Sequence, residues 1–197
     1  MSWLGLILVF SLVDNVILSR LLGISPREGG TGNARASLWL GVWTAVLMGI
    51  SALAGWAIDA LVLEPLGLGF LRTPAFVLSV AGLAFFLEAA AARISPLLVR
   101  SSGFSMQAMA INCATLGIVL LATRGGYTAA ESLIAGLAAG LGFMLVRALM
   151  AAIGERLEIE RIPKALRGFP LELISAGLMA YAFMAFDRAF LAHILGG

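Results

Sequence analysis

Charged residues are scarce in this sequence. Only 12% of its 197 residues are Asp, Glu, Lys or Arg, whereas 61% are hydrophobic. A water-soluble domain carries about 25% charged and about 45–50% apolar residues. The composition therefore indicates an integral membrane protein and largely excludes a soluble enzyme. Because about 20 apolar residues cross a bilayer as one helix, about six such helices would leave no length for a separate soluble domain.

Cysteine and histidine are nearly absent. The chain has one cysteine, Cys113, and one histidine, His193. A single cysteine excludes a disulfide within the chain, and together the two residues cannot supply an ordinary set of metal ligands. No glycine fingerprint for nucleotides, nucleophile triad or zinc spacing is present either. We therefore expect no covalent chemistry from the chain alone, and any metal centre must be shared with a partner.

Long apolar runs predict six transmembrane helices in a single membrane domain, residues 1–197. The runs are continuous and lack the alternation of a barrel strand, so the expected fold class is an all-α integral membrane protein. Gly136 and Gly140, four residues apart in one run, predict close approach of another helix. The six expected spans cover residues 3–24, 38–61, 74–92, 104–123, 129–153 and 169–190.

Basic residues are distributed unevenly among the connections. By the positive-inside rule, the odd-numbered connections are cytoplasmic and both termini lie outside. The net charge of +2 then reflects orientation in the membrane, and we expect lipid and no nucleic acid as a partner. The odd connections hold Arg20, Arg27, Arg35, Arg93, Arg100, Arg156, Arg161, Lys164 and Arg167, against Arg72, Arg124 and Arg188 on the other side.

The two halves of the sequence resemble each other. A shift of 95 residues places Gly41 on Gly136 and Gly82 on Gly177, and a shift of 98 places Asp14-Asn15 on Asn112-Cys113. Three spans per half predict an inverted 3+3 repeat with halves of about 1–98 and 99–197. Chance similarity between helices rich in Ala, Gly and Leu is the alternative.

Polar residues interrupt the first and fourth expected helices, which are equivalent in the repeat. Asp14-Asn15 interrupt the first, and Gln107 and Asn112 interrupt the fourth. Helix ends inside a bilayer expose backbone groups that lipid cannot satisfy, and inverted repeats place their sites at such breaks. The sequence therefore predicts a site near Asn15, Asn112 and Cys113. A free cysteine can also be simply a small buried apolar residue.

Carboxylates within the expected spans also require an explanation, because an ionisable group at the centre of a membrane helix costs about 2.5–3.5 kcal/mol. Asp14 and Glu88 are candidates for coupling to ion or proton movement. The alternatives are a paired structural carboxylate for Asp14 and a paired or snorkelling group for Glu88. Asp59 lies at the end of a span, where a charge needs no functional explanation.

The segment from Ile111 to Gly117, INCATLG, resembles the Asn-Cys segment found in the A subunits of Rnf electron-transport complexes, a family related to the D and E subunits of the sodium-pumping NADH:quinone reductase. The resemblance extends in order along nearly the whole chain. The other matching segments are Leu21-Leu22-Gly23-Ile24-Ser25-Pro26, Phe70-Leu71-Arg72-Thr73, Ala75-Phe76, Arg156-Leu157, Arg167-Gly168 and Ala176-Gly177-Leu178-Met179.

The resemblance implies a membrane subunit of an ion-translocating oxidoreductase in the bacterial inner (cytoplasmic) membrane. Its implied partners are a homologous membrane subunit of opposite orientation (RnfE-like) and the flavin and iron–sulfur subunits of the complex. The family's six-helix inverted repeat and the outside termini of its A-type members agree with the repeat and the charge distribution.

The resemblance also implies an intramembrane 2Fe-2S cluster held jointly with the partner, each subunit giving one cysteine per half. Cys113 matches the second position, but Ser25 stands at the first. Such clusters normally take four thiolates, so the cluster is completed through Ser25 or left incomplete, relocated onto partner ligands, or lost. With a cluster, Cys113 is a ligand, Asn15 and Asn112 are donors around it, and the chain relays electrons. The rival functions are a small secondary transporter and a redox-silent structural subunit.

Overall fold

The computed structural model describes residues 3–13, 15, 18–19, 34–94, 113–159, 163 and 166–183, and its regular elements there are all helical. This confirms the all-helical class for the described residues. The elements are α1 (Trp3–Leu8), the π-helix η1 (Val9–Val13), α3 (Ala34–Ile58), the π-helix η2 (Asp59–Leu63), the 3-10 helix η3 (Gly69–Leu71), α4 (Arg72–Ile94), α7 (Cys113–Arg124), α8 (Ala129–Ile159) and α9 (Phe169–Phe183).

Within the described residues, three helical segments are long and apolar enough to cross a membrane. They are Gly41–Leu63, Gly69–Ala90 and Ala129–Leu157, and they coincide with the second, third and fifth predicted spans. Cys113–Arg124 and Phe169–Phe183 are shorter apolar helices within the fourth and sixth predicted spans. Parts of the first, fourth and sixth predicted spans lie outside the described residues.

The centre of the fold is the packing of α3 against α8. A Cβ on Gly136 would lie 2.7 Å from the Cα of Gly49, and one on Gly140 would overlap the backbone of Ala45, so glycine lets the helices touch. This confirms the close approach predicted for the two α8 glycines. Residue numbers fall along α8 as they rise along α3, so the helices are antiparallel. The contacts pair Gly41 with Met144, Ala45 with Gly140, and Gly49 with Gly136.

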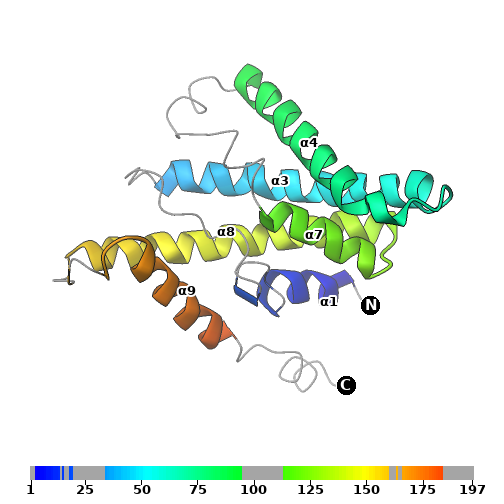
Figure 1. Cartoon of the computed structure of the whole chain (residues 1–197). Coiled ribbons are helices and arrows are strands. Elements are labelled where there is room, and N and C mark those ends of the chain that lie inside the picture. The colour runs from blue at the N-terminus through cyan, green and yellow to red at the C-terminus, as the bar shows by residue number, and fades with distance from the viewer. Residues whose placement is uncertain are drawn as a thin grey trace.

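The remaining helices surround this central pair. The α1 helix packs on α8, and α7 packs on both α3 and α8, whereas α4 and α9 diverge from opposite ends of the pair (Figure 1). The α4 helix and the η3 turn before it expose large apolar side chains such as Phe70, Leu78 and Phe86. In a membrane protein, lipid or a neighbouring subunit covers such a surface, so these apolar side chains are not exposed to water.

A capping box starts α8 immediately after the turn that follows α7. The Thr128 backbone N–H and hydroxyl donate to Oε2 of Glu131 at 3.0 and 2.9 Å, and the Glu131 N–H donates to the Thr128 hydroxyl at 3.4 Å. These bonds satisfy backbone donors at the helix start. Gly126 adopts a φ of 63°, which favours glycine, so the chain reverses sharply between α7 and α8.

Candidate functional site

Asn15 is buried at the irregular end of the first helical segment. It is 1% exposed and follows the π-helix η1, and it lies outside regular helix itself. Its Nδ2 donates to the Ser11 carbonyl at 3.0 Å, and its own carbonyl accepts from the Ser19 backbone N–H at 2.8 Å and the Ser19 hydroxyl at 2.7 Å. The Asn15 side chain thus bonds the backbone of η1. π-Helical turns recur at functional sites.

Asn15 packs against Gly142 of α8. A Cβ at Gly142 would lie 2.8 Å from Nδ2 of Asn15 and 2.7 Å from the carbonyl oxygen of Ser11. Both atoms belong to the hydrogen bond that holds the Asn15 side chain, and one of them is backbone. Only glycine at position 142 allows η1 to approach α8 this closely.

We therefore expect Gly142→Ala to displace Asn15 and to destabilise the chain by about 1–3 kcal/mol, the usual cost of overpacking. Thermal unfolding of the purified protein measures the effect. Gly177→Ala in α9 is the matched control, because a Cβ there meets no atom within 4 Å. If the two variants unfold at the same temperature, Gly142 does not hold this contact.

Cys113 is the first residue of α7, and its side chain is exposed. The next residues of the helix, Ala114 and Thr115, are fully buried. In this chain Cys113 is therefore not a buried apolar residue, which was one alternative from the sequence. Its thiol is accessible at the N-terminal end of a helix whose following turn is anchored in the core.

The structure places Asn15 and Cys113 beside the same apolar cluster. This cluster includes Phe10 and Leu18 from around Asn15, and Ala114 from beside Cys113. Phe143, next to Gly142, also belongs to it. The cluster extends along α8, against which α1, η1 and α7 all pack.

Glu88 lies away from that region, on α4. It is half-buried, one turn after Ala84, which packs with Leu47 of α3 in a separate apolar cluster. Its Oε2 is buried and has no hydrogen-bond partner in the described part of the chain. The alternative of a paired Glu88 requires a partner for this oxygen, and the described residues show none.

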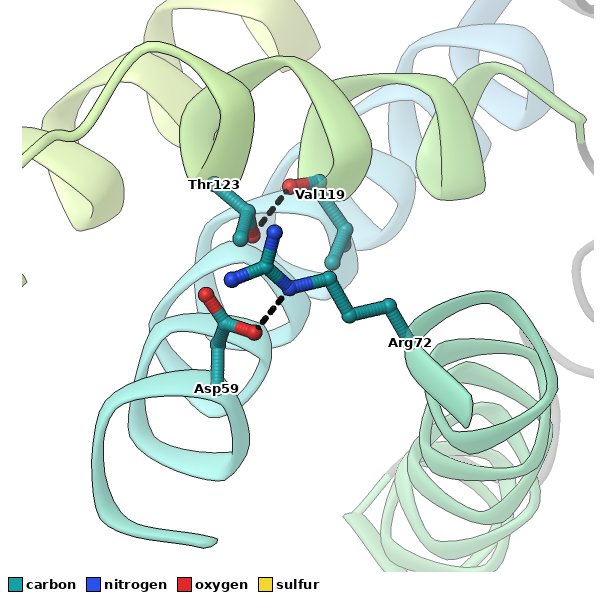
Figure 2. A network of polar contacts seen from close by, with 4 residues as sticks. All are labelled: Asp59, Arg72, Val119 and Thr123. Carbon is teal, nitrogen blue, oxygen red and sulfur yellow. Dashed lines mark hydrogen bonds and ion pairs between the residues drawn. The ribbon is translucent and has the colours of Figure 1, made fainter. Parts of the chain in front are cut away.

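Asp59 and Arg72 form an ion pair that the sequence analysis missed. Asp59, the first residue of η2, is 8% exposed, and its Oδ1 contacts Nε of Arg72 at the start of α4. Figure 2 shows the Arg72 guanidinium pointing from α4 to this carboxylate, beside the α7 turn that ends at Thr123. The pair joins the end of α3 to the start of α4. Its only sequence signal was two opposite charges across one predicted connection.

Asp59→Asn is expected to destabilise the protein by about 1–2 kcal/mol, less than loss of a fully buried ion pair because Arg72 is partly exposed. Chemical or thermal unfolding of the purified protein measures this loss. The double variant Asp59→Asn, Arg72→Gln removes both charges and should recover part of the lost stability. An effect of Asp59→Asn that is unchanged when Arg72 is also replaced would contradict a direct pairing.

The remaining predicted site residues, Asp14, Ser25 and Asn112, lie outside the described residues. Among the residues that are described, no group of three His, Cys, Asp or Glu side chains could hold a metal ion. The described residues contain one thiol, that of Cys113.

Apolar helices of membrane length, packed through glycines and carrying buried polar residues, define a helical membrane protein. The family described as Rnf-Nqr subunit, membrane protein, matches residues 4–189. The chain belongs to this family of membrane subunits, as the resemblance in the sequence implied.

Curated relatives are similar over most of their length. The A subunit of the Na(+)-translocating ferredoxin:NAD(+) oxidoreductase complex of Acetobacterium woodii is 38% identical over 175 residues, which cover 89% of this chain and 91% of the relative. The A subunit of the ion-translocating oxidoreductase complex of Edwardsiella ictaluri is 37% identical over 176 residues, and that of Escherichia fergusonii is 38% identical over 176, with the same coverage.

Proposed function

We propose that this chain is the A-type membrane subunit of an ion-translocating electron-transport complex in the bacterial inner membrane. In this role it pairs with a homologous subunit of opposite orientation and adjoins flavin and iron–sulfur subunits. The observation that carries the proposal is Cys113, the only thiol of the chain, exposed at the start of a helix anchored in the core. The relatives named as the A subunits of such complexes support it.

An inverted repeat of six spans, three per half, with both termini outside, is part of the proposal. The contacts between α3 and α8 support the repeat. A shift of 95 residues converts the contact of Gly41 with Met144 into that of Gly136 with Gly49, and it maps Ala45 onto its own partner, Gly140. A pseudo-twofold axis through that last pair accounts for all three contacts.

Cys113 is the residue of this chain that would bind a 2Fe-2S cluster. Such a cluster is held by cysteine thiolates and carries single electrons. One exposed thiol fits the contribution of one ligand, and the partner subunit would complete the set, with or without Ser25. Asn15 and Asn112 are placed in the proposal as hydrogen-bond donors around the cluster, where such donors tune the potential.

Glu88 and Asp14 are proposed to couple ion or proton movement to electron transfer. The buried Oε2 of Glu88, without a partner in the described part of the chain, supports this role for Glu88.

We expect Glu88→Gln, alone or with Asp14→Asn, to lower ion uptake per electron while electron transfer continues. Uptake and electron transfer are measured on the complex in liposomes. Glu155→Gln, on an exposed residue near the end of α8, is the control. Unchanged ion uptake in the double variant would contradict the coupling role.

The function as a whole is tested by isolating the chain from its native membrane. We expect it to co-purify with flavin and iron–sulfur subunits, and to move ions in liposomes only when the whole complex is supplied with an electron donor. If the purified chain alone transports a solute in the absence of electron transfer, it is a secondary transporter and the proposal is wrong.

A further inference from the structure

Three buried hydroxyl groups, those of Ser51, Thr115 and Ser132, take no part in the proposed function. They are 1%, 0% and 0% exposed, respectively. None of the three oxygens has a hydrogen-bond partner in the described part of the chain. A buried hydroxyl left without a partner is unfavourable, because nothing replaces the hydrogen bonds that it made to water.

Other hydroxyls in the described part of the chain donate a hydrogen bond to a nearby backbone carbonyl. Ser19, Thr123 and Ser175 each donate to the carbonyl four residues earlier, at 2.7, 2.9 and 2.9 Å. That bond is the ordinary solution for Ser and Thr in a membrane helix. Ser51 and Ser132 do not make this bond, and the Thr115 hydroxyl also has no partner in the described part of the chain.

The three hydroxyls lie near the contacts that join α3, α7 and α8. The α8 helix is antiparallel to α3 and follows α7 after a short turn, so α7 runs in the same direction as α3 (Figure 1). Gly55 of α3 packs on Val119 of α7. Ser51 and Thr115 each precede that contact by one helical turn, which places them at the same level of two parallel helices.

Ser132 approaches the same level from α8. It lies one turn before Gly136, whose Cβ would come within 2.9 Å of Ala52, the neighbour of Ser51. Around these positions, one apolar cluster joins the three helices through Met48, Ala114 and Ala135, each fully buried. The three hydroxyls thus lie near one level of an otherwise apolar junction of three helices, here called the polar spot.

The chemistry of this spot favours a small neutral occupant. A cation such as Ca²⁺ takes about six to eight oxygen ligands, commonly including carboxylates, whereas this spot offers three neutral hydroxyls among apolar residues. An internal water makes about two to four hydrogen bonds and can both donate and accept. We infer that Ser51, Thr115 and Ser132 bind ordered water at the junction of α3, α7 and α8. The inference does not depend on a cluster at Cys113.

The test uses the purified complex and two readouts. Radiolysis of bound water oxidises neighbouring side chains, so Met48, although fully buried, should be labelled in the native protein and lose that label in Thr115→Val and Ser51→Ala. Thr115→Val removes a hydrogen-bonding group at nearly constant volume and should lower Tm by about 2–4 °C. Thr123→Val is the matched control, because its hydroxyl bonds its own helix.

Three results would overturn the inference. The first is native Met48 that resists labelling, or is labelled equally in all variants. The second is Thr115→Val that is as stable as the native complex or more stable, as expected if the hydroxyl has no partner at all. The third is a native Tm that rises in sodium chloride over choline chloride and loses this difference in Thr115→Val, which would make the occupant a cation.

Discussion

Replacing Gly140 with valine is expected to prevent the chain from accumulating in the membrane. Any Cβ at this position overlaps the Cα and Cβ of Ala45, so α3 and α8 cannot keep their contact. Overpacking against a flexible side chain costs about 1–3 kcal/mol, and here the obstacle is backbone at the centre of the fold. Because net stability is about 5–15 kcal/mol, we expect a large loss of folded protein.

The amount of chain in isolated membranes, and its thermal unfolding after extraction, measure this effect. Gly82→Val is the matched control, since Gly82 also lies in an apolar helix, α4, but a Cβ there meets no atom within 4 Å. Equal accumulation of the two variants would contradict the packing of α3 on α8 through Gly140.

Electron transfer through the complex is expected to fall at least about tenfold in Cys113→Ala, the lower end of what loss of a group supporting a metal site costs. Cys113 is the only thiolate that this chain can offer, so no other residue of the chain replaces it. Cys113→Ser keeps an oxygen ligand and should retain more activity than the alanine variant, with a shifted potential.

Turnover of the purified complex with its electron donor measures this effect. Ser175→Ala is the control, because the Ser175 hydroxyl is occupied by the Leu171 carbonyl of its own helix. A Cys113→Ala complex that assembles fully and transfers electrons at the native rate would exclude the ligand role.

The sequence predicted the membrane helices well where they depend only on a continuous run of apolar residues. Apolar runs at 38–61, 74–92 and 129–153 coincide with α3 and η2, α4, and α8, because a bilayer requires long uninterrupted apolar helices. The glycines at 136 and 140 also predicted helix contact, since small residues four apart form one face of a helix.

Features that depend on relative helix placement were not predictable in this way. Asp59 looked like an ordinary charge at the end of a span, and its pairing with Arg72 depends on the turn that brings α4 back towards α3. The need for glycine at position 142 follows from the packing of η1 against α8, which the sequence alone does not show. Whether a helical hydroxyl bonds its own backbone, as Thr123 does and Ser51 does not, also depends on the surrounding helices.

The central claim is that this chain contributes Cys113 to an iron–sulfur cluster inside an electron-transport complex. Iron content and the electron paramagnetic resonance spectrum of the anaerobically purified complex test it most directly, comparing wild type with Cys113→Ala. The proposal predicts a cluster signal and matching iron in the wild type that Cys113→Ala removes while the other redox centres remain. A wild-type complex without that signal, or a signal that persists in Cys113→Ala, would contradict it.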